Sequence, residues 1–106
     1  MNNKIKLYKQ EIDNIYKTGK HLRSSYVKLI VLKNDLISNR IVFSIKKQNA
    51  NAVERNKIKR RIKSIIFKNE QIKSCDMVIS VFPKIKLATF AELEEDLKKI
   101  MVKLEN

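Results

Sequence analysis

Residues 51–63 read Asn-Ala-Val-Glu-Arg-Asn-Lys-Ile-Lys-Arg-Arg-Ile-Lys, and this stretch predicts the most distinctive helix of the chain. Asn51 and Glu54 have the spacing of a capping box, in which two side chains satisfy backbone N–H groups at the helix start. Isoleucines recur at helical spacing from Ile58 onward, so one side of the helix is apolar. We therefore expect a helix over residues 52–67 that packs its isoleucine side on a core.

The remaining sides of this helix are cationic. One stripe holds Asn56, Lys59, Arg60 and Lys63, and Lys57 and Arg61 flank it. Like charges at this spacing repel one another, and a polyanion would relieve the repulsion. The alternative is a solvated helix face, which is the usual explanation of a run of charges. The scarcity of acidic residues after Glu54 favours contact with RNA or DNA.

The whole chain is basic as well. Its 106 residues include 24 Lys and Arg against 11 Asp and Glu, for a formal net charge of +13. A hydrophobic content of 43% predicts one folded domain over residues 1–106 rather than a disordered basic tail. Several acids cluster at Glu92, Glu94, Glu95 and Asp96, which leaves the earlier part of the chain still more basic. We expect one positive surface that binds phosphate backbones.

Several classes of site and location are disfavoured. With one cysteine and one histidine, the chain lacks a disulfide framework, a Cys- or His-based metal cluster and most His-dependent nucleophiles. We expect Cys75 to pack as a small hydrophobe and His21 to lie exposed in a basic turn. The apolar runs are only strand-length, and no helix carries the aromatic face of a membrane-surface helix. We expect a cytoplasmic protein that makes no membrane contact.

The pattern of elements predicts an α/β (α+β) sandwich, in which three helices pack on a small mixed sheet. The chain is expected to begin with a helix over residues 4–17, followed by strands over 26–32 and 40–46 and an optional third strand. The cationic helix comes next. A strand over 77–82 and a final helix, which begins with a capping box at Thr89 and Glu92, complete the order. The first two strands are expected to pair as a hairpin. The cationic helix would then be the crossover between parallel strands.

Residues 47–63 also resemble the signature of the bacterial ribonuclease P protein component, Lys-Lys-x-Gly-Asn-Ala-Val-x-Arg-Asn-Arg-x-Lys-Arg-x-x-Arg. The Asn-Ala-Val-x-Arg-Asn core at residues 51–56 is intact, and Lys59 and Arg60 are correctly spaced. Residues 12–19 are similar to the family's Phe-x-x-Val-Phe-x-x-Gly, although Ile12 replaces an aromatic. Lys57 and Lys63 replace arginines, which keeps the charge but loses the two-pronged geometry of a guanidinium. The resemblance extends over nearly the whole chain.

This resemblance implies a subunit of a ribonucleoprotein whose large RNA removes the 5′ leader from precursor tRNA. The protein would bind the ribonuclease P RNA and the leader, and Mg²⁺ would act through the RNA rather than through a protein cluster. No catalytic residue is expected in the protein, which would be a monomer outside the complex. The resemblance also implies a left-handed crossover, whereas the general rule predicts a right-handed one.

Two RNA-binding sites follow from the resemblance. The catalytic RNA would contact Lys47, Arg55, Asn56, Lys57, Lys59, Arg60, Arg61 and Lys63. A cleft between the first helix and the sheet would hold the single-stranded leader, lined by Ile12, Tyr16, Tyr26, Lys28, Ile30, Ser44 and Lys46. A base could stack on Tyr16, although plain core packing explains the helical spacing of this residue equally well. Arg55 has a similar alternative, because it lies near the apolar side and could cap or pack.

A rival function remains open at this stage. A generic structural or ribosome-associated RNA-binding protein, with no role in processing, would need a basic face too. The run at residues 51–56 separates the two hypotheses, because a generic binder has no reason to carry it.

Overall fold

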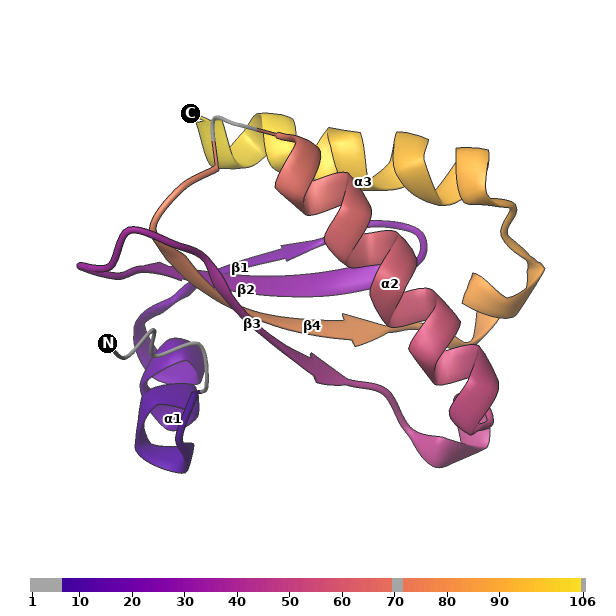
Figure 1. The fold of residues 1–106 in the computed structure, drawn as a ribbon, viewed down its shortest axis with the longest axis horizontal. Helices are drawn as coiled ribbons and strands as arrows, with labels where there is room; N and C mark the ends of the chain where they lie inside the picture. The colour runs from indigo at the N-terminus through magenta and orange to yellow at the C-terminus, as the bar shows by residue number, and fades with distance from the viewer. Residues whose placement is uncertain (1–6, 70–71, 106) are drawn as a thin grey trace.

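The computed structural model describes residues 7–69 and 72–105, which form three α-helices on a four-stranded mixed sheet (Figure 1). The elements are α1 (Lys9–Thr18), β1 (Lys20–Arg23), β2 (Val27–Lys33), β3 (Arg40–Ser44), the 3-10 helix η1 (Lys47–Asn49), α2 (Ala52–Lys68), β4 (Cys75–Val81), the 3-10 helix η2 (Pro83–Leu87) and α3 (Phe90–Glu105). The predicted fold class is confirmed. Residues 4–6, where the first helix was expected to begin, lie outside the described residues.

The strands are arranged in the order β1-β2-β4-β3. The predicted hairpin between residues 26–32 and 40–46 is wrong, because β4 lies between β2 and β3. β4 is buried along nearly its whole length and takes a central position, whereas the half-buried β3 takes an edge. The hairpin that forms joins β2 to β1, a short strand that contains His21. His21 is exposed as expected, but it lies in a strand rather than in a turn.

Helix α2 connects β3 to β4, which are parallel neighbours, as predicted. In Figure 1 both strands run toward the right, α2 returns toward the left in front of the sheet, and β4 lies above β3. This arrangement is a left-handed crossover, the opposite of the usual connection. It has the hand that the family resemblance implied.

The main core lies between one face of the sheet and helices α2 and α3. Alternate residues of the central strands point to this face. The buried members from the sheet include Val27, Leu29, Met77 and Ile79, and those from the helices include Ile62, Ile65, Ile66, Leu93, Leu97 and Ile100. Cys75 packs in the same core, and burial raises the pKa of its thiol.

Helix α1 covers part of the opposite face of the sheet. Ile15 packs there on Ile30 and Val78 in a smaller apolar cluster. Gly19 ends the helix as predicted. A side chain does not fit at this position, because backbone atoms of α1 and β2 lie close to it. A Cβ atom at Gly19 would lie 2.5 Å from the carbonyl oxygen of Ile15 and 3.0 Å from that of Val31. The chain can therefore pass directly from α1 into the sheet.

Asp96 is buried, unlike its exposed neighbour Glu95. The residue is only 6% exposed. Its carboxylate accepts hydrogen bonds from Ser24 Oγ (2.5 Å), Ser25 N (3.2 Å) and Tyr26 N (2.9 Å). Helix α3 thus holds the turn between β1 and β2.

We expect Asp96→Ala to lower the free energy of unfolding by about 1–3 kcal/mol, because it leaves partly buried donors without an acceptor. Urea denaturation followed by circular dichroism measures this loss. Glu95→Ala is the matched control, since Glu95 is an exposed acid on the same helix. Equal losses in the two variants would mean that the turn does not depend on the Asp96 carboxylate.

Candidate RNA-binding surfaces

The start of α2 is set by the capping box read from the sequence, and its orientation by the buried isoleucine side. Asn51 Oδ1 accepts a hydrogen bond from Glu54 N, and Glu54 Oε1 accepts one from Asn51 N, both at 2.8 Å. The helix then buries Ile62, Ile65 and Ile66 against the sheet and α3. With the apolar side held down, the cationic side chains must project from the other three sides.

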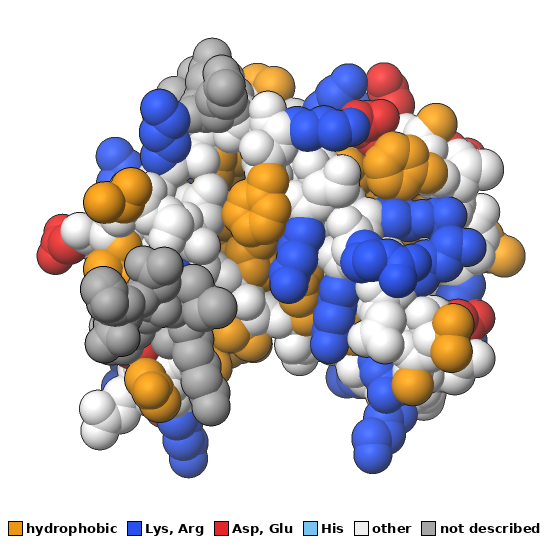
Figure 2. Space-filling view, viewed as in Figure 1, with side chains coloured by type: hydrophobic (Ala, Val, Ile, Leu, Met, Phe, Trp, Pro, Cys, Tyr) orange, Lys and Arg blue, Asp and Glu red, His pale blue; other side chains and the backbone are white. Residues whose placement is uncertain are grey.

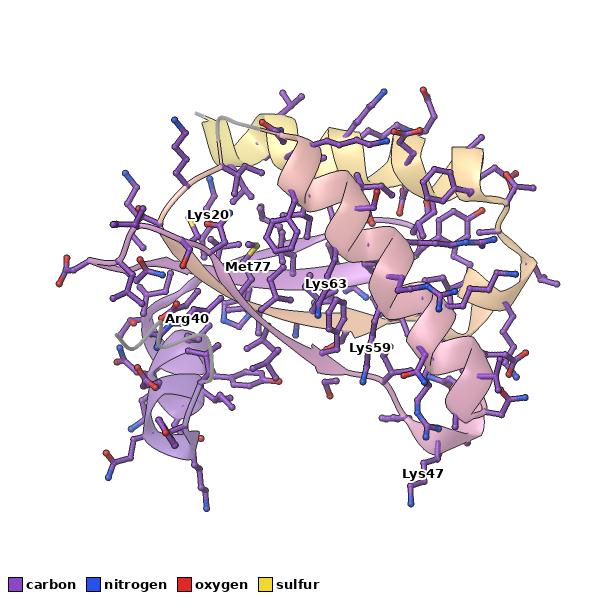
Figure 3. The ribbon with its side chains drawn as sticks, viewed as in Figure 1. Lys20, Arg40, Lys47, Lys59, Lys63 and Met77 are labelled. Atoms are coloured by element: carbon purple, nitrogen blue, oxygen red, sulfur yellow. The ribbon has the colours of Figure 1, made fainter. Side chains whose placement is uncertain are left out.

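Two aromatic contacts show where the flanks of α2 lie. Lys63 Nζ lies 6.0 Å from the centroid of the Phe43 ring on β3, and Arg61 Cζ lies 5.7 Å from that of Phe90 at the start of α3. Figure 3 shows Lys59 and Lys63 on the side of α2 that faces β3. Lys57 lies one turn before Arg61 and shares the α3 side. Arg60 is exposed on the side opposite the core.

The predicted RNA-binding residues therefore form one continuous surface, which we call the cationic band: Lys47, Arg55, Asn56, Lys57, Lys59, Arg60, Arg61 and Lys63. Lys47 belongs to η1, just before α2, and points away from the protein body (Figure 3). Figure 2 shows Lys and Arg side chains gathered over this part of the surface. Within residues 7–69 and 72–105, no acidic side chain forms an ion pair with the band.

Arg55 has a structural role at the edge of this band. Its Nη1 donates a hydrogen bond of 2.8 Å to the carbonyl oxygen of Ala50, and the side chain is half-buried. One N–H group of Arg55 thus holds the residue that precedes the helix cap, and the side chain packs partly against the protein. A guanidinium carries five N–H donors, so this bond leaves room for an RNA contact as well.

The sheet face under α1 is organised in three cross-strand rows, defined by the pairing register. The rows are Leu32, Asp76 and Arg40; then His21, Ile30, Val78 and Val42; then Arg23, Lys28, Ser80 and Ser44. Helix α1 packs on the first two rows through Glu11, Ile12 and Ile15. The third row, which we call the open row, is polar and half-buried or exposed.

The residues predicted for the leader cleft divide into two groups. Tyr16, 44% exposed on α1, lies on this side of the sheet with the half-buried Ile12, and Lys28 and Ser44 belong to the open row. Lys46 is exposed just beyond β3.

The other two predicted residues, Ile30 and Tyr26, do not line this surface. Ile30 is 1% exposed, because it lies directly under α1. Tyr26 precedes β2 and packs against the main core on the other face, where Lys84 Nζ lies 5.9 Å from the centroid of its ring. The alternation of side chains between the two faces of β2 therefore does not continue to Tyr26.

Two residues of this surface were missed in the sequence. Arg23 belongs to the open row, and its Cζ lies 5.2 Å from the centroid of the Phe82 ring. A paired guanidinium and aromatic ring form a platform on which a base can stack. Phe82 was assigned to the end of a buried strand, and β1 was not predicted, so no local signal placed Arg23 beside Phe82.

In the described part of the chain, no group of three or more His, Cys, Asp or Glu side chains could hold a metal ion. The buried carboxylates Asp76 and Asp96 are both engaged in hydrogen bonds within the fold. Across the described residues, no helix has the length and apolar character needed to cross a membrane.

Comparison with known proteins agrees with this description. The family model for Ribonuclease P matches residues 1–105. The ribonuclease P protein component of Alkaliphilus metalliredigens is 32% identical over 105 residues, covering 97% of this chain and 94% of the relative. The ribonuclease P protein component of Finegoldia magna is 36% identical over 99 residues, covering 92% of this chain and 87% of the relative.

Solved structures show the same fold. The ribonuclease P protein from Thermotoga maritima has a TM-score of 0.78 at 24% identity, covering 92% of this chain and 94% of its own. That of Staphylococcus aureus has a TM-score of 0.81 at 23% identity, covering 93% of each chain. The signature on α2, the matching family model and these relatives together show that the chain belongs to the ribonuclease P protein family.

Proposed function

We propose that this ribonuclease P subunit binds the ribonuclease P RNA through the cationic band and the 5′ leader of precursor tRNA along the open row. The RNA subunit would cleave the precursor between the leader and the tRNA. The protein would bind both the RNA subunit and the precursor. The observation that carries this proposal is the cationic band, built on the family signature and free of ion pairs among the described residues. The alternative of a structural RNA-binding protein outside tRNA processing is not favoured by the family match.

The cationic band suits a folded RNA. Its charges cover three sides of one helix, so phosphates on both walls of an RNA groove lie within reach. Each phosphate that is neutralised releases condensed counterions, which gives affinity without sequence specificity. The self-repulsion of the band is relieved in the same step.

The open row suits a single strand. Lys28 and Arg23 supply positive charge along the sheet, while Tyr16 and Phe82 supply rings for base stacking. Serine hydroxyls at Ser44 and Ser80 can donate to or accept from phosphate, ribose or base edges. Single-stranded nucleic acids are typically bound by such a combination of charge and aromatic surface.

Hydrolysis of the phosphodiester bond needs an activated water, and we assign that step to Mg²⁺ held by RNA. Mg²⁺ prefers oxygen ligands and keeps much of its water shell, which RNA phosphates allow. The described carboxylates do not converge on a site for it. The protein contributes positive charge and position, and we expect it to work as a monomer in the cytoplasm, where precursor tRNA is processed.

The isolated protein should show no specific cleavage of precursor tRNA, because the side chains that the structure describes offer no set of groups that activates water. Gel analysis of 5′-labelled precursor tRNA, incubated with purified protein and Mg²⁺, measures this. Adding the ribonuclease P RNA should restore cleavage in the same tube. Specific 5′ cleavage by the protein alone would contradict the assignment of chemistry to the RNA.

Tyr16→Ala should weaken binding of precursor tRNA to the holoenzyme by about 1–3 kcal/mol, because a stacked base loses its platform. Mature tRNA, which lacks the leader, should bind about as before. Equilibrium binding of both ligands measures the difference. If the two ligands lose affinity equally, or the variant unfolds, Tyr16 is a packing residue and the leader lies elsewhere.

The double variant Lys59→Glu, Arg60→Glu should keep its melting temperature and lose affinity for the ribonuclease P RNA. The slope of log affinity against log salt should fall by about 0.7–0.9 for each lost phosphate contact. The matched control is Lys98→Glu, Lys99→Glu, which makes the same charge change at exposed positions of α3. An unchanged slope in the α2 variant, or an equal change in the control, would mean that the RNA does not bind the cationic band.

A further inference from the structure

Helix α1 rests on the sheet through a small apolar cluster. Leu7, Ile15, Ile30 and Val78 are its buried members. Apolar contact is non-directional, so such a small cluster constrains the direction of the helix axis only weakly. Polar links at the two ends of α1 add directional contacts. At the C-terminal end, the carbonyl oxygen of Tyr16 lies 3.1 Å from His21 Nε2.

The link at the N-terminal end is a network of three charges. Arg40 is 5% exposed and lies between α1 and the sheet (Figure 3). Its Nε and Nη2 donate to the two oxygens of Asp76 on β4, at 2.8 and 2.7 Å. The same Nη2 donates to Glu11 Oε2 at 2.9 Å. Hydrogen bonds to Asp76 and Glu11 raise the pKa of Arg40, so it stays charged.

Glu11 joins this network to the backbone of α1. Its Oε1 accepts a hydrogen bond of 3.0 Å from the N–H of Tyr8 at the start of the helix, while Oε2 accepts from Arg40. Glu54 and Glu92 occupy the same capping position in α2 and α3. Among the described residues, Glu11 is the one of these three that also accepts from an arginine. The cap of α1 is thereby tied to a guanidinium that Asp76 already holds rigid.

Stability alone does not account for the network. Buried ion pairs recover little more than the cost of removing their charges from water, and well-packed apolar groups often stabilise as much. Here the cost is higher, because Arg40 Nη1 is buried with no hydrogen-bond partner among the described residues. What the charges add over apolar groups is direction, since hydrogen bonds constrain both distance and angle.

We propose that Glu11, Arg40 and Asp76 form a positioning network that orients α1 and thereby fixes the position of Tyr16 on the sheet face that carries the open row. Glu11 and Tyr16 lie on the same ten-residue helix, so a tilt at the Glu11 end moves Tyr16 relative to the sheet. None of the three charged residues needs to touch RNA for this role. The inference rests on the proposed binding of the leader at Tyr16.

The test is a double-mutant cycle in the reconstituted holoenzyme, with binding of precursor and mature tRNA as the readout. Glu11→Gln should lower the affinity for precursor tRNA by about three- to tenfold, which is a modest coupling between neighbouring groups. The affinity for mature tRNA should stay unchanged. Direct electrostatics predicts the opposite sign, because removing a carboxylate near a polyanion strengthens binding. Glu11 is 30% exposed, so the substitution is compatible with the fold.

The matched control is Glu92→Gln, which makes the same change in the capping box of α3 and should leave both affinities unchanged. Because Glu11 acts through Tyr16, the double variant Glu11→Gln, Tyr16→Ala should bind precursor tRNA no more weakly than Tyr16→Ala alone. Additive losses, a gain in affinity, or no effect of Glu11→Gln would overturn the positioning role. If Tyr16→Ala itself does not change the affinity for precursor tRNA, the proposed leader site at Tyr16 is wrong, and the positioning role that depends on it is wrong as well.

Discussion

The need to cover both faces of β4 shapes the rest of the molecule. Met77 and Ile79 point to one side of this strand and Val78 to the other, and all three are fully buried. A strand with two apolar faces is stable only inside a sheet that has helices on both sides. β2 and β3 therefore flank β4, the crossover helix α2 packs with α3 on one face, and α1 is required on the other.

The two faces are covered unequally, and this inequality creates the candidate leader site. The long helices α2 and α3 cover one face with a large core. The shorter α1 covers only the two rows of the opposite face that contain the apolar cluster and the Arg40 ion pairs. The remaining row carries Arg23, Lys28 and serines, which do not need to be buried. A polar row that stays partly or fully exposed, on the same sheet face as the exposed Tyr16, is thus a consequence of where the apolar residues stop.

The cationic band shows how a fold can carry a surface that weakens its own helix. The capping box at Asn51 and three buried isoleucines stabilise α2. The ring contacts of Lys63 with Phe43 and of Arg61 with Phe90 place two charges where cation–π attraction offsets part of the repulsion. In the proposed function, the repulsion among the other charges is relieved by the RNA. Binding energy for the partner and destabilisation of the free helix therefore have the same source.

Local patterns in the sequence determined the helices and most of the strands, and the tertiary structure decided which of them meet. The capping box at Asn51, the isoleucine stripe, the apolar strand before Pro83 and the family signature are all short-range features, because helix periodicity and capping act over a few residues. They were sufficient for the fold class, the crossover helix and the cationic band.

Strand order, by contrast, depends on pairing between distant segments, which leaves no local signal. For that reason the expected hairpin was wrong, β1 was missed, and Ile30 and Tyr26 were assigned to a surface that they do not reach. The pairing of Arg23 with Phe82, the buried Asp96 and the Arg40 network likewise exist only after the sheet has formed. Each of them joins residues far apart in the chain, where burial and register, rather than sequence spacing, determine the contact.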